Sequence, residues 1–300
     1  MDISGKIFYN QGSASKLGWE PSWFNADAFD EDLIEKIQKF QEEYDLSADG
    51  LCGPLTYARV RTAREAAFEI KHTFSPKNGI IANGEIAPIQ WDKIVNLNDE
   101  NNLALPKECY RSVQGGKARP TMVVTHWDAA LSAQSCYKIL KKRGISSHFV
   151  IDNDGTIYQM VDTQHVAWHA GIKRVNTVSI GIDFSNAYYL KYQNYYKKKG
   201  FGSRPILEDS KVHGRKLKPH LGYYPVQIEA YKALLKCLSA HYGIELKCPL
   251  GADGDMLCGI SQAAASGKFK GVVSHYHLTS RKIDCAGLKI DEIIKQIKED

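Results

Sequence analysis

The sequence predicts a mixed α/β (α+β) protein, in which a small helical domain precedes a larger domain built on a central mixed β-sheet flanked by helices. Two patterns support this prediction. Residues 30–66 carry apolar side chains at helical spacing, whereas from residue 119 onward short apolar runs alternate with amphipathic segments. A length of 300 residues is enough for two modest domains.

The composition is that of an ordinary globular protein, with 43% apolar and 24% charged residues. A net charge of +5 suits an anionic polymer or surface but does not require one. The 16 tyrosines suit flat contacts with sugars or peptides as well as a core. We expect a monomer that has no nucleic-acid partner.

The first residues and the cysteines bear on the compartment. MDISGKIFYNQGSASKLGW lacks an apolar core preceded by lysines, so we expect no ordinary secretory signal. No run approaches 18 apolar residues, so we expect no membrane span. Seven scattered cysteines without a CxxC pair favour neither a disulfide framework nor a thiolate zinc cage, and they indicate synthesis in a reducing compartment.

A helical unit is predicted between residues 30 and 66. SADG is typical of a turn, and GPLTYARV begins a second helix with Pro54 and Thr56 near its start. Apolar positions at helical spacing define the first helix: Leu33, Ile34, Ile37, Phe40 and Tyr44.

The stretch FQEEYDLSADGLCGPLTYARV, residues 40–60, resembles the small three-helix peptidoglycan-binding domain, whose repeat reads FQxxxxLxxDGxxGPxT. The resemblance implies a three-helix domain over residues 1–66 that binds bacterial peptidoglycan. A generic helix-turn-helix is the alternative interpretation.

Residues 67–118 are predicted to be a connector without assigned chemistry. HTFSPKNGIIANGE is turn-rich, and APIQWDKIVNLNDENN suggests one short helix. ALPKECYRSVQGGKARP indicates irregular structure.

The remaining residues, 119–300, alternate strands and helices. Buried strands are predicted in PTMVVTHWDAA, which ends near His126, in TVSIGIDFS and in GVVSH. Helices are predicted in SAQSCYKILKKRGISS, closed by Gly144, in YPVQIEAYKALLKCLSAHYGIEL and in DEIIKQIKED. HFVIDNDGTIYQMV predicts a hairpin with NDG at its turn. Residues 187–224 interrupt this order and are predicted to be a surface insertion rich in Tyr, Lys and Arg.

The order of His126, WHAG, SIGID, His275 and RKID resembles the zinc-dependent N-acetylmuramoyl-L-alanine amidases of type 2, a family shared with peptidoglycan-recognition proteins and many phage endolysins. The resemblance covers residues 119–300. It implies one catalytic zinc ion held by His126, His275 and Asp284. Two imidazoles and one carboxylate leave the fourth position open for a water nucleophile. Cys285 stands where many relatives have proline, which leaves a thiolate ligand as an alternative.

The same resemblance implies the catalytic groups. Lys282 would stabilise the oxyanion, and Asp183 matches the position where part of the family has a glutamate as general base. Ser147 occupies the place of a tyrosine in some relatives. Trp168 and His169 would line the substrate groove, although Asp183 and His169 also have purely structural interpretations.

Four other histidines are expected outside the metal site. We interpret His148 as a supporting residue and His277 as either a supporting or an exposed one. His213 and His220 lie in the charged insertion and are expected to be solvated.

These features predict a peptidoglycan hydrolase that cleaves the amide between N-acetylmuramic acid and L-alanine, as a phage endolysin does. It would be made in the host cytoplasm and would reach the wall in the periplasm through a holin-made lesion. One alternative is a non-catalytic peptidoglycan-binding protein on the same fold. Another is a zinc peptidase of the stem peptide.

Overall fold

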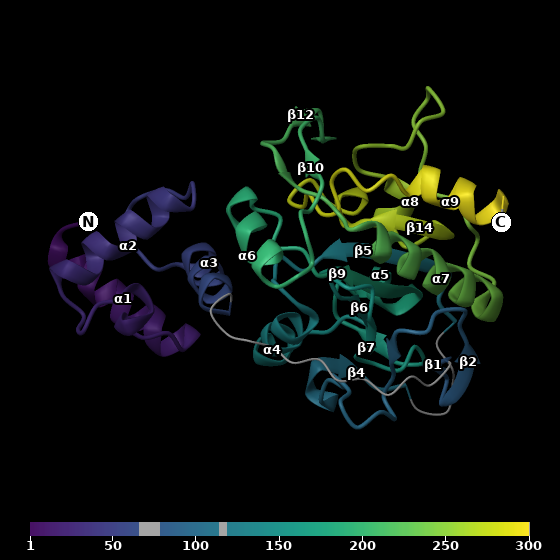
Figure 1. The fold of residues 1–300 in the computed structure, drawn as a ribbon, viewed down its shortest axis with the longest axis horizontal. Coiled ribbons are helices and arrows are strands. Elements are labelled where there is room, and N and C mark those ends of the chain that lie inside the picture. The colour runs from purple at the N-terminus through teal and green to yellow at the C-terminus, as the bar shows by residue number, and fades with distance from the viewer. Residues whose placement is uncertain (66–78, 114–118, 300) are drawn as a thin grey trace. The chain divides into compact units, whose positions relative to one another are not determined.

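The structure is a computed structural model that describes residues 1–65, 79–113 and 119–299. It divides into two compact units, residues 1–70 and 71–300, which are drawn in Figure 1. Within the described ranges, no helix is long and apolar enough to cross a membrane. Parts of the predicted connector, residues 67–78 and 114–118, lie outside the described residues.

The first unit contains the three expected helices, α1 (Ile3–Leu17), α2 (Glu31–Glu43) and α3 (Pro54–Glu65), with a short 3-10 turn at Pro21–Phe24. The Asp30 side chain caps α2 by accepting a hydrogen bond from the Leu33 amide. Helix α2 buries its apolar face at Leu33, Ile34 and Ile37.

A buried glutamine ties the turn between α2 and α3 together. The Gln41 amide donates to Asp49 Oδ1 at 2.9 Å and to Thr56 Oγ1 at 3.0 Å, and its oxygen accepts from the Gly50 amide at 2.8 Å. Gly50 has a φ of +74°, and a Cβ there would lie 2.7 Å from the Ile34 side chain. The DG and T positions of the motif therefore have a structural role in this turn.

The second unit is built on a six-stranded mixed sheet, which confirms the predicted fold class. Its order is β14 (Gly271–Ser274), β5 (Met122–Trp127), β9 (Ser179–Phe184), β6 (Phe149–Ile151), β7 (Ile157–Gln159) and β3 (Ile94–Val95). The strand pairs β14–β5, β5–β9, β6–β9 and β3–β7 are parallel, and the predicted hairpin β6–β7 is antiparallel.

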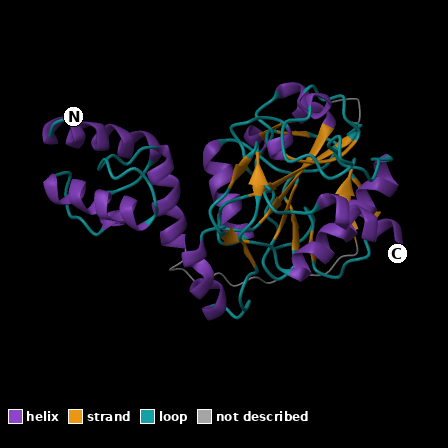
Figure 2. Cartoon of the chain, turned by 90° about the horizontal axis from the view of Figure 1, so that it is seen from above, coloured by secondary structure: helices purple, strands orange, loops and turns teal. Residues whose placement is uncertain are grey.

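Helices cover both faces of this sheet, as Figure 2 shows. On one face, α7 (Pro225–Tyr242) and α9 (Ile290–Glu299) pack against Val123, Phe149 and Ile182. On the other face, α4 (Ala133–Arg143) packs against Val150, and α5 (Lys173–Val178) with α8 (Gln262–Ala265) packs against Val124. Neighbouring residues of a strand thus point to opposite faces of the sheet and pack against different helices.

The prediction of a short helix within residues 87–102 is wrong. Instead, β1 (Gly79–Ala82) and β2 (Glu85–Pro88) form an antiparallel hairpin, and β3 joins the main sheet beside β7. The Gln159 side chain hydrogen-bonds both the amide and the carbonyl of Ile81, at 2.7 and 2.6 Å. Contacts with residues far along the chain therefore decide the structure of this segment.

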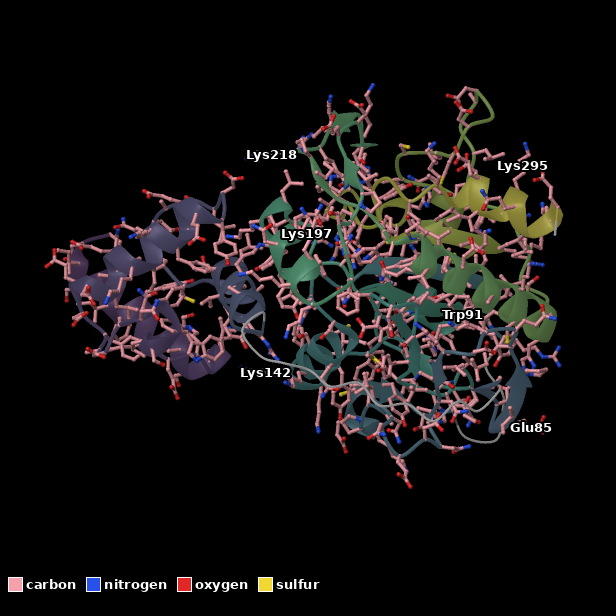
Figure 3. The ribbon with its side chains drawn as sticks, in the orientation of Figure 1. Glu85, Trp91, Lys142, Lys197, Lys218 and Lys295 are labelled. Atoms are coloured by element: carbon pink, nitrogen blue, oxygen red, sulfur yellow. The ribbon has the colours of Figure 1, made fainter. Side chains whose placement is uncertain are left out.

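The 187–224 insertion is anchored in the protein. It contains a 3-10 turn (Leu190–Tyr192), α6 (Gln193–Lys198), β10 (Ile206–Leu207), β11 (Lys211–Val212), β12 (Arg215–Lys216) and β13 (His220–Leu221). The guanidinium of the buried Arg204 lies 4.5 and 4.4 Å from the rings of Tyr196 and Tyr224, and it donates to the Gly222 carbonyl at 2.7 Å. Exposed lysines of the insertion include Lys197 and Lys218, which are labelled in Figure 3.

Two histidine predictions in this insertion need correction. His220 is buried, because its ring packs edge-on against Trp127 and its Nδ1 donates to the Lys218 carbonyl. His213 is half-buried, and its Nε2 donates to the Lys282 carbonyl at 3.0 Å. The insertion therefore contacts the RKID turn.

Candidate metal centre

The candidate site lies at the carboxyl end of three neighbouring parallel strands. In the β5–β9 pairing, His126 lies directly opposite Asp183. On the other side of β5, Ser274 of β14 pairs with Thr125, and His275 follows at once in a 3-10 turn. The carboxyl ends of parallel strands meet at one edge of a sheet, where ligands commonly bind.

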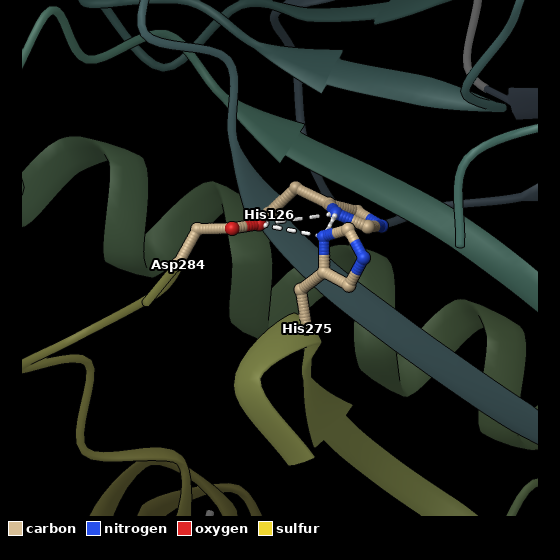
Figure 4. Close-up of side chains that lie close together, drawn as sticks. All are labelled: His126, His275 and Asp284. Carbon is tan, nitrogen blue, oxygen red and sulfur yellow. Dashed lines mark hydrogen bonds and ion pairs between the residues drawn. The ribbon is translucent and has the colours of Figure 1, made fainter. Parts of the chain in front are cut away.

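Three ligand-type atoms converge at this edge, as Figure 4 shows. His126 Nδ1 lies 3.0 Å from His275 Nδ1 and 3.3 Å from Asp284 Oδ2. His275 Nδ1 lies 3.0 Å from the same Asp284 oxygen. All three residues are buried, with exposed fractions of 5%, 4% and 7% in sequence order.

This donor set fits a zinc ion. Ligand atoms about 2.0–2.1 Å from a tetrahedral zinc lie about 3.3 Å from one another, close to the separations in the cluster. Two imidazole nitrogens and one carboxylate oxygen are the ligand types of a catalytic zinc site with an open fourth position. A cation among them would also relieve the repulsion between lone pairs that face each other in a buried space.

The electrostatics of the cluster agree with a cation site. Burial alone would raise the pKa of Asp284, but the charges and hydrogen bonds of His275 and His126 outweigh it and hold that pKa well below its usual range. Burial lowers the pKa of His275, and the neighbouring Asp284 opposes this shift. A carboxylate and an unprotonated imidazole are the forms that bind metal.

Asp183 and Lys282 are the two further charged residues expected to act beside the cluster. Burial raises the pKa of Asp183, while His126 and the Ser147 hydroxyl counteract the shift. Lys282 is exposed, and its positive charge adds to the lowering of the pKa of His275, after burial and the charge of His126. A carboxyl group therefore stands opposite His126 on the neighbouring strand, and an ammonium group belongs to the turn that carries Asp284.

The WHAG loop places Trp168 and His169 differently. Trp168 is 38% exposed, and its amide donates to Ser146 Oγ at 2.9 Å. His169 lies against His126, with His169 Nδ1 3.0 Å from His126 Nε2. Burial, followed by the charges of the neighbouring histidines, lowers the pKa of His169 well below its usual value. The sequence interpretation assigned His169 to the substrate groove and missed this contact.

Cys285, the alternative ligand, lies in the hydrophobic core rather than in the cluster. Burial raises the pKa of its thiol well above the usual value, which disfavours the thiolate that a metal would need. The geometry thus favours Asp284 over its neighbour.

Two further histidines hydrogen-bond the backbone of strands that carry the site. His148 Nδ1 accepts from the Gly181 amide at 3.0 Å, and burial lowers the pKa of His148 to about 4. His277 Nδ1 accepts from the Ser274 amide at 2.9 Å, and burial lowers the pKa of His277 to about 4. His277 is buried, so the exposed alternative predicted for it is wrong.

Comparisons with known proteins place the chain in a family. Solved structures similar to it include E. coli AmiD, an N-acetylmuramyl-L-alanine amidase in complex with anhydro-N-acetylmuramic acid-L-Ala-D-gamma-Glu-L-Lys (24% identity, 65% of each chain covered, TM-score 0.40). A mutant endolysin from Bacillus subtilis is 17% identical, with 69% of this chain and 96% of that chain covered and a TM-score of 0.37. The N-acetylmuramoyl-L-alanine amidase LysC from Clostridium intestinale is 19% identical, with 63% and 96% covered and a TM-score of 0.36.

The chain thus spans about 65% of the length of the AmiD structure. No curated protein sequence matches it. The family model Amidase_2, described as N-acetylmuramoyl-L-alanine amidase, matches residues 116–286, more than half of the chain and all three residues of the cluster. The chain belongs to the N-acetylmuramoyl-L-alanine amidase family Amidase_2.

Proposed function

We propose that this protein hydrolyses the amide bond between N-acetylmuramic acid and the L-alanine of the peptidoglycan stem peptide, with one zinc ion held by His126, His275 and Asp284. The observation that carries the proposal is the convergence of His126 Nδ1, His275 Nδ1 and Asp284 Oδ2 within 3.3 Å of one another. Membership of the amidase family supplies the reaction class.

When bound, zinc supplies Lewis-acid chemistry that activates water at neutral pH. Asp183 takes a proton from the attacking water and delivers it to the leaving nitrogen, and its raised pKa suits both steps. Lys282 donates a hydrogen bond to the oxygen that becomes negative at the scissile carbonyl. Trp168, which is partly exposed, offers a flat apolar surface to the substrate.

The first 66 residues would hold the enzyme on the wall. The motif that resembles a peptidoglycan-binding domain supports this role, although the Gln41 network gives Asp49, Gly50 and Thr56 a structural purpose as well. Tethering a catalytic unit to its polymeric substrate raises the effective concentration of the scissile bond.

The combination of a wall-binding and an amidase unit in one chain suits a phage endolysin. Such an enzyme would accumulate in the bacterial cytoplasm and would pass to the wall through a holin-made lesion. Co-expression in a bacterial host tests this proposal. The chain expressed together with a holin should lyse the host, and the chain expressed alone should not.

Mass spectrometry of digested peptidoglycan tests the reaction. An amidase releases stem peptides with a free L-alanine amine and leaves the glycan chains intact, whereas a stem-peptide peptidase shortens the stems. A non-catalytic binding protein releases nothing. Activity should disappear with a chelator and return with zinc.

His126→Ala should be inactive in this assay, and His241→Ala, which alters an exposed histidine on α7, is the matched control and should be fully active. Shortened stems from the wild-type protein would contradict the proposed bond specificity. Undiminished activity of His126→Ala would contradict the proposed metal site.

A further inference from the structure

A chain of hydrogen bonds with a defined donor-to-acceptor direction leads from Ser179 to the candidate metal centre. It begins at Ser179, whose Oγ lies 2.7 Å from the Val175 carbonyl and donates its only proton to it. Ser179 Oγ also lies 3.2 Å from His169 Nε2, and toward this nitrogen it acts as an acceptor. His169 Nε2 is therefore the protonated nitrogen.

The direction continues through two imidazoles. With one proton on the ring and that proton on Nε2, His169 Nδ1 is an acceptor. His126 Nε2 lies 3.0 Å away, so it donates its N–H to His169. The other nitrogen of His126, Nδ1, then carries a lone pair and faces His275 Nδ1 and Asp284 Oδ2.

The His169 ring packs so closely against strand β9 that only a glycine fits at position 181. A Cβ at Gly181 would lie 2.7 Å from His169 Cγ and 2.9 Å from Ser147 Oγ, closer than real Cβ contacts. The strand cannot yield easily there, because Gly181 exchanges two hydrogen bonds with His148, at 3.0 and 3.1 Å. The glycine of SIGID thus serves the close approach of this imidazole.

From the hydrogen-bond directions and the Gly181 contact, we propose that His169 is a positioning residue, which holds His126 in the tautomer and ring orientation that present Nδ1 to the metal. The inference rests on the proposed function, in which His126 is a zinc ligand. Acceptors behind ligating histidines are a general feature of metal sites, and losing one typically costs about 10–100-fold in metal affinity. Here the acceptor is a second histidine rather than a carboxylate or a carbonyl.

Zinc affinity of the full chain, measured by competition with a chelating dye, is the first test. His169→Leu should bind zinc about 10–100-fold more weakly than the wild-type protein. His169→Asn, which can place an amide oxygen near the position of Nδ1, should recover a large part of this loss. Equal losses in the Leu and Asn variants would show that the ring acts by packing alone, and that result would overturn the proposal.

Nitrogen-15 NMR of the His126 ring in the metal-free full chain is the second test. The wild-type protein should carry the His126 proton on Nε2, and His169→Leu should show a mixture of both tautomers. A predominantly Nδ1-protonated His126 in the wild-type protein would overturn the inference. So would an unchanged tautomer together with unchanged zinc affinity in His169→Leu.

Gly181→Ala tests the same position from the strand side. It should weaken zinc binding as His169→Leu does, because the new methyl group displaces the imidazole. Gly259→Ala is the matched control, since a Cβ there meets nothing within 4 Å, and it should bind zinc normally. Normal zinc binding by Gly181→Ala would contradict the proposed close approach.

These tests separate the inference from the proposed function. If the wild-type protein binds zinc and only the His169 effects fail, the inference alone is wrong. If zinc binding depends on His169 but no amide is cleaved, the proposed reaction is wrong and the inference stands. If the wild-type protein binds no zinc, the proposed metal centre is wrong, and the His126 tautomer still decides whether His169 directs it.

Discussion

The two sides of the candidate metal centre are built by different means. On the strand side, His126 and Asp183 occupy paired positions of β5 and β9, so the backbone ladder sets their separation. On the turn side, His275 and Asp284 are nine residues apart, and a few bonds close the turn between them. These include Tyr276 N to Asp284 O at 3.0 Å and Cys285 N to Ser274 Oγ at 3.3 Å.

From this difference we expect the strand half of the site to be more rigid than the turn half. A parallel ladder has many hydrogen bonds that must break together before His126 moves, whereas a turn held by a few bonds adjusts more easily. In each half, nevertheless, a buried imidazole accepts a hydrogen bond from a backbone amide. His148 accepts from Gly181 of β9, and His277 accepts from Ser274 at the start of the turn. We expect substitutions on the two sides to differ more in their effect on the stability of the protein than in their effect on catalysis.

The largest effect is expected from removing a ligand on either side. His126→Ala and Asp284→Ala should each abolish zinc binding and hydrolysis, because either change leaves only two protein ligands. Metal content by mass spectrometry and activity on purified peptidoglycan measure this outcome. Cys285→Ala is the matched control on the turn side and should keep its zinc. Loss of zinc in that control, with the fold intact, would make the thiolate the ligand.

The acid-base groups should show smaller but still large effects. Asp183→Asn on the strand side should lower kcat by about 10²–10⁴-fold, since it removes general acid-base help. Lys282→Ala on the turn side should lower kcat by about 10²–10³-fold, as does the loss of one oxyanion donor. Both variants should retain stoichiometric zinc. A fully active, zinc-loaded Asp183→Asn would rule out its role as general base.

The strand side should also show a pH-dependent stability through His148. Its pKa falls from 6.5 in the unfolded chain to about 4 in the folded protein, so the neutral ring stabilises the fold above pH 6.5. As the pH drops from 6.5 toward 4, the unfolded state gains a proton that the folded state does not, and stability on the order of 3 kcal/mol is lost. Urea unfolding at several pH values measures this loss.

His148→Asn is the comparison variant for that experiment. It keeps an acceptor near the Gly181 amide but cannot titrate, so the free energy of unfolding should vary less between pH 6.5 and 4 than in the wild-type protein. Parallel pH profiles for the two proteins would contradict the role assigned to His148.

The smallest effect on chemistry is expected from removing the first unit. Residues 71–300 alone should keep the bond specificity and the zinc dependence, while sedimenting less with purified peptidoglycan than the full chain does. The matched experiment is sedimentation of residues 1–70 alone. Equal sedimentation of the full chain and of residues 71–300 would remove the wall-binding role proposed for the first unit.

Elements with a strong local pattern could be predicted from the sequence alone. Helices α2, α4 and α7 carry apolar residues at helical spacing, and Asp30 and Gly144 cap helix ends through contacts with residues a few positions away. Strands β5 and β9 are continuous apolar runs, as expected of strands buried on both faces. In each case the features that determine the structure, which are residue spacing, capping residues and apolar composition, lie within the segment itself.

Short strands and buried polar contacts were decided by the tertiary structure. The two residues of β3 are strand because β7, some 60 positions later, pairs with them, and no local pattern reports such a partner. Arg204 belongs to a charged stretch that resembles a solvated surface, yet its guanidinium is buried against two tyrosine rings and donates to two backbone carbonyls.

The candidate site shows the same division. The sequence by itself determined which residue types stand at the ends of the strands, and the family motifs singled out His126, His275 and Asp284 among them. Only the tertiary structure decided that His169 Nδ1 lies within hydrogen-bond distance of His126 Nε2. That contact joins residues 43 positions apart, and it exists because β9 presents a glycine where any other side chain would occupy the space of the ring.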